Sequence, residues 1–244
     1  MAELQGAAKQ RYVADLFSRI SGRYDLMNDL MTLGMHRNWK RRTAAMAAQG
    51  LRGPALDVST GTGDLAFALG RCSGVESVVG VDLLPEMIGK ARAKWAGNRR
   101  APSADLLVGD ALSLPFSDGT FACATAGFSL RNMPGLSAAM AEMVRVLRPG
   151  GRLALLELTP MERGVKSLLF RPYFHGLVPL IGLVVAGDRS AYTYLPRSVD
   201  HFPPADRLAA MLGELGLDPV GYRKLGFGTV SLHWGEKPGG EKSV

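Results

Sequence analysis

The chain has 244 residues, of which 47% are hydrophobic, so it is long enough for one large α/β domain and too short for two generous ones. Its two cysteines, Cys72 and Cys123, lie in different predicted elements and no Cys/His cluster has metal-ligand spacing, which argues against a disulfide framework and against a metal site. The net charge of +7 favours anionic neighbours, either nucleic acid or membrane headgroups. The first residues lack the pattern of a secretory signal, so we expect the protein to stay inside the cell.

Residues 9–50 have helical character and carry the basic run His36-Arg-Asn-Trp-Lys-Arg-Arg42. Such a run is either a solvated helix face or a patch that meets anionic headgroups.

From residue 54 to residue 158, apolar runs alternate with helix-like stretches. Helices are predicted over 83–95 and 135–147, and strands over 54–58, 77–81, 105–108, 121–126 and 152–158. Strands that alternate with helices predict a parallel sheet with crossovers. The turn Arg148-Pro-Gly-Gly151 is expected to end the second helix before the last strand.

Residues 161–204 interrupt this alternation with an aromatic and proline-rich segment. Its apolar run, 177–185, is well below the roughly 20 residues that span a bilayer and contains Pro179, so no transmembrane helix is predicted. The segment would line an apolar pocket, rest on a membrane or form a buried cap helix. A helix over 208–215 and strands over 220–225 and 229–234 then close the fold.

The most informative stretch is Ala55-Leu-Asp-Val-Ser-Thr-Gly-Thr-Gly-Asp64, an apolar strand that breaks into a glycine turn. Gly61 and Gly63 allow a tight turn and a close approach of the backbone to a ligand. Asp82 ends the next strand, where a carboxylate accepts hydrogen bonds from ribose hydroxyls. This arrangement predicts a site for a nucleoside cofactor.

The glycine turn also satisfies the Gly-x-Gly-x-x-Gly/Ala pattern of dinucleotide enzymes, so by itself it does not separate NAD from S-adenosylmethionine. The carboxylate of Asp57, at the end of the first strand, would repel a pyrophosphate and suits a ligand that carries an ammonium and a sulfonium. We therefore predict S-adenosylmethionine, with a plain turn residue as the other interpretation of Asp57.

Several motifs in order resemble one family. They are Tyr24-Asp-Leu-Met-Asn-Asp29 with His36-x-x-Trp39, Gly61-Thr-Gly-Asp64, Phe128-Ser-Leu-Arg-Asn132 and Arg145-Val-Leu-Arg-Pro-Gly-Gly-Arg-Leu-Ala-Leu-Leu-Glu157. Over residues 12–236, the sequence resembles the C-methyltransferases of ubiquinone and menaquinone biosynthesis.

The resemblance implies the class I S-adenosylmethionine-dependent methyltransferase fold, a Rossmann-like α/β architecture with a seven-stranded, mostly parallel sheet and a helical cap. We expect a single domain over residues 1–244. Its expected parts are an N-terminal helical cap over 1–50, a cofactor-binding core over 51–160, a cap insertion over 161–205, and a C-terminal helix with closing strands over 206–236.

The resemblance also places residues around the cofactor: Thr62 lines the site, Asp82 holds the ribose, and Asp110 with Ala111 lies beside the adenine. Tyr24, with Asp25 and Asn28, would belong to a lid or cap a helix. Two positions depart from the family's pattern. Thr60 replaces a glycine, which a negative φ tolerates, and Gly127 stands where the family often has a serine. The predicted cofactor-binding residues are Tyr24, Asp57, Gly61, Thr62, Gly63, Asp82, Asp110, Ala111 and Gly127.

Members of this family methylate a ring carbon of a polyprenyl quinol, so the resemblance implies that substrate and no metal. Attack by a ring carbon needs an ionised ring oxygen. Arg131 is the predicted stabiliser of the phenolate and Asn132 the residue that orients the ring, unless the two only bond loop carbonyls. His175 and His36 are the candidate bases, each with a packed core histidine as the alternative. Glu157 would contact either a backbone amide or the substrate.

The expected location is the inner face of the cytoplasmic membrane, as a peripheral contact through the basic run at 37–42. The sequence does not decide between a monomer and a homodimer. A methyltransferase for another phenolic or lipid substrate is the nearest rival. An NAD-dependent reductase and a non-catalytic binding protein remain open, whereas a nucleic-acid methyltransferase is disfavoured because the chain lacks the Asn/Asp-Pro-Pro-Tyr/Phe motif for a flipped base.

Overall fold

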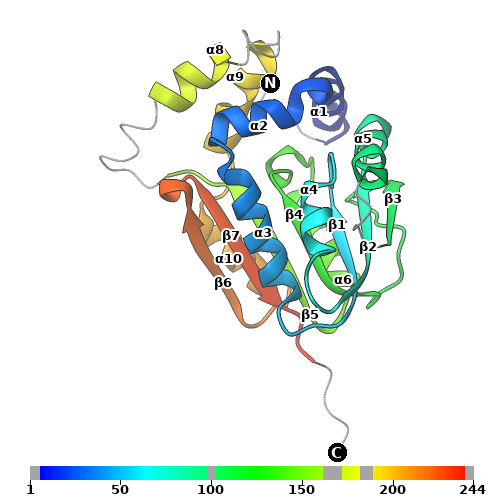
Figure 1. Ribbon diagram of the computed structural model, residues 1–244. Coiled ribbons are helices and arrows are strands. Elements are labelled where there is room, and N and C mark those ends of the chain that lie inside the picture. Colours follow the sequence, from blue (N-terminus) through cyan, green and yellow to red (C-terminus); the bar gives the residue numbers. More distant parts are fainter. Residues whose placement is uncertain (1–5, 98–102, 162–171, 182–188, 240–244) are drawn as a thin grey trace, which may run out of the picture.

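The computed structural model describes residues 6–97, 103–161, 172–181 and 189–239. Seven strands form one sheet in the order β3-β2-β1-β4-β5-β7-β6, in which β7 runs antiparallel to both neighbours and the other pairs are parallel. This confirms the predicted seven-stranded, mostly parallel sheet (Figure 1). The strands are β1 (Gly53–Val58), β2 (Val75–Asp82), β3 (Ala104–Val108), β4 (Phe121–Gly127), β5 (Leu147–Leu158), β6 (Val220–Leu225) and β7 (Val230–Glu236).

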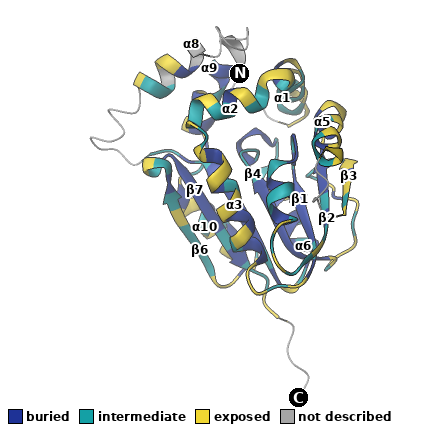
Figure 2. Ribbon diagram, in the orientation of Figure 1, coloured by how far each residue is buried: buried dark blue, intermediate teal, exposed yellow. Residues whose placement is uncertain are grey.

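Helices cover both faces of this sheet, which is why the central strands are almost continuously apolar. On one face lie α3 (Met35–Ala48) and α4 (Asp64–Leu69), and α5 (Pro85–Ala96) packs on β2 and β3. On the other face lie α6 (Leu136–Arg145) and α10 (Ala205–Glu214). Figure 2 shows β1, β4 and β5 buried between these layers.

The start of β5 differs from the sequence prediction. Helix α6 already ends at Arg145, and the strand begins at Leu147 rather than after the proline and glycines. Phe121 pairs with Leu147 and Cys123 with Arg152, so the turn Arg148–Gly151 is a bulge inside the strand. Proline and glycine are tolerated there because a bulge leaves backbone groups out of the ladder.

A helical cap lies over the carboxyl ends of the parallel strands (Figure 1). It contains α1 (Gly6–Ile20), the short turn η1 (Ser21–Arg23), α2 (Tyr24–Thr32), the π-helical turn η3 (Tyr173–Leu177), α8 (Val178–Ile181) and α9 (Arg189–Asp200). Its own core joins distant segments through the buried side chains Leu16, Ile20, Met27, Val178, Tyr192 and Tyr194. Helix α3, which we expected in the cap, packs against β4 and β5 instead. None of the described helices is long and apolar enough to cross a membrane.

Candidate cofactor and substrate sites

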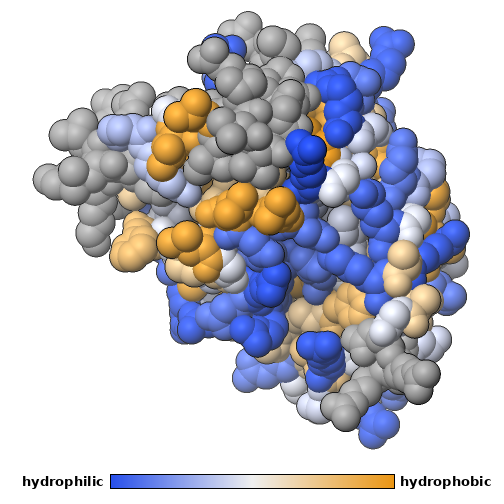
Figure 3. Space-filling view, turned by 45° about the horizontal axis from the view of Figure 1, so that its top comes forward, coloured by the Kyte–Doolittle hydropathy of each residue, from blue (hydrophilic) through white to orange (hydrophobic). Residues whose placement is uncertain are grey.

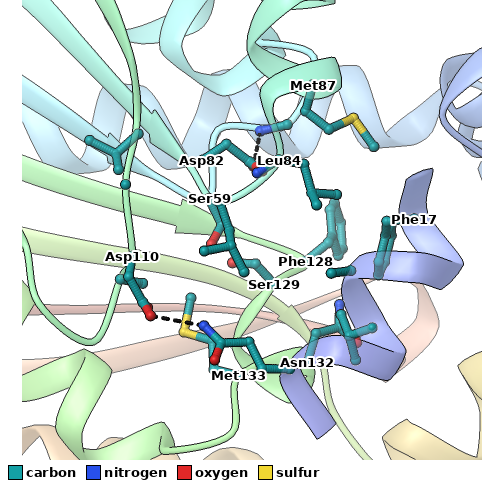
Figure 4. Close-up of a pocket in the computed structure, with 18 of the residues that line it drawn as sticks. Phe17, Ser59, Asp82, Leu84, Met87, Asp110, Phe128, Ser129, Asn132 and Met133 are labelled. Carbon is teal, nitrogen blue, oxygen red and sulfur yellow. Dashed lines mark hydrogen bonds between the residues drawn. The ribbon is translucent and has the colours of Figure 1, made fainter. Parts of the chain in front are cut away.

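A cavity of about 120 Å³, here called the cofactor cavity, lies at the carboxyl ends of β1, β2 and β4 beneath α1 (Figure 4). Helix α1 covers it: Gln10 Nε2 donates to Asp110 Oδ2 at 2.8 Å, and Lys9 Nζ donates to the carbonyl of Met133 at 2.9 Å. The cavity is smaller than the roughly 300 Å³ at which small-molecule sites begin, because this helix closes it. Six of the predicted cofactor residues line it, namely Tyr24, Gly61, Asp82, Asp110, Ala111 and Gly127.

The turn after β1 brings its backbone to the cavity wall through left-handed residues. Gly61 has φ +56° and Gly63 has φ +87°, conformations that favour glycine. Ser59, which also lines the cavity, has φ +54°, whereas Thr60 is not among the described residues with positive φ. Thr60 therefore replaces the family's glycine without backbone strain, as predicted.

The carboxylate of Asp82 is locked at the end of β2. Its Oδ2 accepts a hydrogen bond from Gly61 N at 2.8 Å and its Oδ1 accepts one from Leu84 N at 2.9 Å. Burial raises the pKa of Asp82, and the backbone N–H donors oppose that rise. A carboxylate accepts about four hydrogen bonds, so the group, oriented by the backbone donors, can accept a further hydrogen bond from a ligand.

Asp57 lies under the glycine turn and does not line the cavity. It is completely buried, and its two oxygens accept hydrogen bonds from Thr60 Oγ1 at 2.6 Å and Thr125 Oγ1 at 2.8 Å. Burial raises its pKa to about 6, against these two hydrogen bonds. Asp57 thus supports the turn from below, and its contact with the cofactor stays a prediction.

Thr62 also turns away from the cavity, as does Gly63, and Thr62 joins a network of charges instead. Its Oγ1 donates to Asp25 Oδ1 of α2 at 2.7 Å and accepts from Lys94 Nζ of α5 at 3.0 Å. Lys94 pairs with Asp25 and with Asp64, each at 2.7 Å, and Lys40 pairs with Asp64 at 2.8 Å. Burial alone would raise the pKa of Asp64, but the two lysines outweigh it and hold that pKa below its usual range. The network ties the cap helix α2 to the glycine turn.

An apolar cavity of about 510 Å³, here called the substrate chamber, lies next to the cofactor cavity. Cap and core both contribute to it, through α1, α2, α3, η3, α8, α9 and the turn η5 (Gly226–Gly228). Phe17, Tyr24 and Phe128 line both cavities, so these three side chains mark the junction between them. Phe17 and Phe128 lie together at one end of the cofactor cavity in Figure 4.

Phe128 is held at φ +59°, a left-handed conformation that costs a bulky residue about 1–3 kcal/mol. Its N–H donates to the carbonyl of Leu156 at 2.7 Å, which fixes this conformation. Observed strain of this kind is concentrated at binding and catalytic sites.

Arg131 lies in η2 (Leu130–Asn132) at the wall of the chamber, and it is paired rather than a lone cation. Its Nη1 donates to Glu157 Oε1 at 2.5 Å and to the carbonyl of Phe128 at 2.7 Å. Glu157 is fully buried and also accepts from the N–H groups of Leu158 and Arg131. Asn132 faces the cofactor cavity instead, and its buried Oδ1 has no partner.

Of the two candidate bases, the side chain of His175 lies outside the described residues, although its backbone belongs to η3. His36 is buried at the chamber wall, where its Nε2 bonds Asp29 Oδ1 at 2.8 Å and its Nδ1 has no partner. Burial lowers the pKa of His36, which the bond to Asp29 opposes. No group of three His, Cys, Asp or Glu side chains in the described part of the chain is arranged to hold a metal.

Sequence reasoning missed Leu84 and Met87, which line the cofactor cavity after β2. An apolar pair directly after a ligand-binding carboxylate, at the start of a helix, was the available signal. It also missed Tyr194, whose place in the chamber depends on how α9 packs.

Comparisons with known proteins agree with this architecture. Residues 5–237 match the model of the ubiE/COQ5 methyltransferase family. The chain is 42% identical to a demethylmenaquinone methyltransferase of Roseiflexus castenholzii, with 95% of both chains covered. It is 39% identical to a ubiquinone/menaquinone biosynthesis C-methyltransferase UbiE of Desulfotalea psychrophila, covering 92% of this chain and 90% of the relative.

Solved structures show the same fold at low identity. Magnesium protoporphyrin IX methyltransferase of Synechocystis PCC 6803, with bound SAH, is similar with a TM-score of 0.66 and 16% identity, over 93% of this chain and 99% of that chain. A putative methyltransferase of Haloferax volcanii in complex with the Trm112 activator is also similar, with a TM-score of 0.66 and 19% identity. The match covers 94% of this chain and 99% of that chain. The fold is that of the class I S-adenosylmethionine-dependent methyltransferases, and the chain belongs to the ubiE/COQ5 methyltransferase family.

Proposed function

We propose that this protein transfers a methyl group from S-adenosylmethionine to a ring carbon of a polyprenyl quinol, either demethylmenaquinol or the corresponding ubiquinone precursor. The observation that carries the proposal is the junction at Phe17, Tyr24 and Phe128, where a cavity that holds the carboxylates of Asp82 and Asp110 at the strand ends adjoins an apolar chamber. The names of the relatives, demethylmenaquinone methyltransferase and UbiE, support the same reaction.

The residues of the cofactor cavity fit S-adenosylmethionine by their chemistry. Asp82 offers preorganised acceptors for ribose hydroxyls, and Asp110 with Ala111 borders the part assigned to the adenine. When bound, the cofactor supplies a methyl group on a positively charged sulfur, and the methyl–sulfur electron pair stays on the sulfur. Because α1 closes the cavity, it has to move for the cofactor to enter, and the contacts of Gln10 and Lys9 are among those that break.

The substrate side has to favour an ionised ring oxygen and exclude water. The chamber is lined mainly by apolar side chains, which keeps water from the reacting carbon. The ring oxygen gives its proton to water, and the phenolate is stabilised by N–H donors of Arg131 that Glu157 does not take. After the ring carbon has gained the methyl group, its hydrogen leaves as a proton to water, and the C–H electron pair restores the aromatic ring. Asn132, which lines the cofactor cavity, would orient a ring that reaches through the junction.

We also propose that the mouth of the chamber rests on an anionic membrane surface. Leu33 and Phe227 line the chamber and are 86% and 84% exposed, and both have left-handed backbone conformations. Exposed Leu30, Met35 and Leu177 adjoin the same chamber, with the basic side chain of Arg37 close by in the sequence. Figure 3 shows hydrophobic side chains gathered on this side of the molecule beside hydrophilic ones.

This membrane contact is tested by flotation with vesicles at low salt. The protein should float with vesicles of anionic lipid and not with zwitterionic ones, and the double variant Leu33→Asp/Phe227→Asp should lose flotation while it still methylates a short-tailed quinol. Equal behaviour of variant and wild type would reject the contact. A homodimer is a separate prediction, which light scattering on the purified protein tests.

The reaction itself is tested with methyl-labelled S-adenosylmethionine and chemically reduced, short-tailed demethylmenaquinone and demethylated ubiquinone precursor. We expect label on the ring, located by mass spectrometry, and none when the oxidised quinones are supplied. Bound cofactor without label on either quinol would overturn the substrate and favour another phenolic or lipid acceptor.

A further inference from the structure

Besides Nδ1 of His36, two polar groups of residues that line the chamber are buried and have no hydrogen-bond partner in the described part of the chain. One is the hydroxyl of Tyr194, from α9 in the cap, whose residue is 6% exposed. The other is Nε of Arg131, from η2 after β4, whose residue is 8% exposed. Burying such a group without a partner costs free energy, so an orphaned donor that lines a cavity indicates a ligand that completes it. Oγ of Ser129 and Oδ1 of Asn132 are also buried without a hydrogen-bond partner, but these two residues line the cofactor cavity.

We propose that the hydroxyl of Tyr194 and the Nε–H of Arg131 together bind one ring oxygen of the quinol, as a two-donor site where the chamber meets the catalytic loop. The inference rests on the proposed function and deepens it, because it assigns a substrate contact to a residue of the cap insertion.

The two groups come from distant parts of the chain and are brought together by packing. Helix α9 contacts η2, and both Tyr194 and Arg131 line the substrate chamber. Burial raises the pKa of Tyr194. The positive charge of Arg131 lowers this pKa, and the negative charge of Glu157 raises it. The ring of Tyr194 is held edge-on against Tyr12, with ring centroids 5.7 Å apart, so its hydroxyl is oriented before any substrate binds.

The chemistry of the pair selects an oxygen that accepts hydrogen bonds. The Nε–H of an arginine is a donor only, and a tyrosine whose pKa is raised above 10 keeps its proton and donates at neutral pH. Glu157 takes Nη1 of Arg131 and two backbone N–H groups, which leaves Nε free for a ligand. Two donors that share one acceptor oxygen stabilise a phenolate more than the neutral phenol.

The role of Tyr194 is that of a hydrogen-bond donor and not of a base. The phenol proton leaves to water, Tyr194 keeps its own proton, and the ring oxygen is held so that an adjacent ring carbon faces the junction. Because Phe128 lies in the same loop as Arg131 and its carbonyl accepts from Arg131 Nη1, the oxygen site and the junction are coupled in position.

The test is Tyr194→Phe, which removes one oxygen and keeps the ring that packs on Tyr12. We expect kcat/KM for the reduced quinol to fall roughly 10- to 100-fold, the loss that follows from one hydrogen bond to a charged acceptor. The Kd of S-adenosylmethionine should stay within about twofold, because the hydroxyl lies outside the cofactor cavity. The rising limb of the pH profile of kcat should move to higher pH by about one unit for each tenfold loss of phenolate stabilisation. A merely structural role would leave that limb in place.

The matched control is Tyr12→Phe, which removes the hydroxyl of the neighbouring ring outside the chamber. This variant should have the kcat/KM and the pH profile of wild type. A second readout needs no turnover: an alkyl-substituted nitrophenol is titrated by absorbance while bound to the protein. Binding to the wild-type protein should lower the pKa of the nitrophenol, and binding to Tyr194→Phe should lower that pKa less. An unchanged pH profile and an unchanged pKa of the bound phenol would overturn the inference even though wild type methylates the quinol. Failure of wild type to methylate any quinol would instead overturn the proposed function.

Discussion

The cofactor cavity and the substrate chamber share three side chains, yet they are assembled in different ways. The cofactor cavity is made by strand ends, and its defining contact, Gly61 N to Asp82 Oδ2 at 2.8 Å, joins two adjacent parallel strands. The chamber is made by helices from both ends of the chain and is lined by side chains of the cap. A site on adjacent strands inherits its geometry from the sheet register, whereas a site between helices depends on how distant segments pack. Substitutions should therefore separate cofactor binding from substrate handling.

The largest expected effect is at Arg131, at the wall of the chamber. Arg131→Gln should lower kcat by about 10²- to 10³-fold, as for loss of a donor that stabilises developing charge, with the Kd of S-adenosylmethionine within about twofold. The single variant leaves Glu157 buried and unpaired, which costs about 3–5 kcal/mol of stability. The double variant Arg131→Gln/Glu157→Gln should recover the melting temperature and not the activity. Recovered activity in the double variant would show that the role of Arg131 is structural.

Asp57 sharpens the comparison because it lies beneath the glycine turn, where burying its charged carboxylate costs stability. Its pKa is raised from 3.8 to about 6 in the folded protein, so its favourable contribution is present below pH 3.8 and is lost as the pH rises through about 6. A shift of this size is about 3 kcal/mol in favour of the protonated form. Asp57→Asn should therefore raise the free energy of unfolding by about 1–3 kcal/mol at pH 8 and change it little at pH 3.5. Urea unfolding at both pH values measures the difference, and a uniform change would contradict it.

Asp82→Asn tests the cofactor cavity alone. Loss of a charged acceptor for ribose hydroxyls should raise the Kd of S-adenosylmethionine about 10- to 100-fold. The KM of the quinol at saturating cofactor should not change, because Asp82 does not line the chamber. Isothermal titration calorimetry measures the Kd of S-adenosylmethionine, and initial rates give the KM of the quinol. A proportional rise in both would mean that the two cavities are not independent.

Leu195→Trp tests the chamber alone. Leu195 lines the chamber from α9 and is partly buried, so a larger side chain fills space that we assign to the isoprenoid tail. The KM of a long-tailed quinol should rise about tenfold, which corresponds to about 1.4 kcal/mol, and that of a short-tailed quinol should stay within about twofold. Leu107→Trp, on the exposed edge strand β3, is the matched control. Equal KM changes for both tail lengths would place the tail elsewhere.

The smallest expected effect is at Asp25, where the cap is tied to the glycine turn. Asp25 pairs with Lys94 at 2.7 Å, and the side chains are 40% and 35% exposed, so the pair contributes less than about 1 kcal/mol. Asp25→Asn should raise the Kd of S-adenosylmethionine and the KM of the quinol together, each about two- to threefold, with a weaker dependence on salt than in wild type. Asp15→Asn, from an exposed pair on α1, should change neither.

Local signals predicted the sheet, and six of the nine predicted cofactor residues line the cofactor cavity. The apolar runs coincide with β1 to β7 within a few residues, and the register of β1 with β2 brings Gly61 and Asp82 together. The predicted start of β5 was wrong because proline and glycine occur both in bulges and at helix ends, so the sequence pattern does not distinguish the two. Local pattern likewise assigned α3 to the cap, although its apolar face packs on the sheet.

The partners of buried charges did not follow from the sequence. Asp57 and Thr62 look like ligand contacts in the motif, yet one bonds two threonine hydroxyls and the other bonds Asp25, 37 residues away. Arg131 was predicted to stabilise the phenolate, and the sequence did not indicate its pairing with Glu157, 26 residues further along. In each case the partner was present in the sequence and no local pattern paired it.

The sequence by itself determined the strands, the glycine turn and the acidic residue at the end of β2, because hydrophobic period and backbone conformation are properties of neighbouring residues. Only the tertiary structure decided which side chains face the cofactor cavity, how Arg131 is paired, and that Tyr194 from the cap reaches the same wall. Those outcomes depend on burial, and burial is decided by contacts between segments that are distant along the chain.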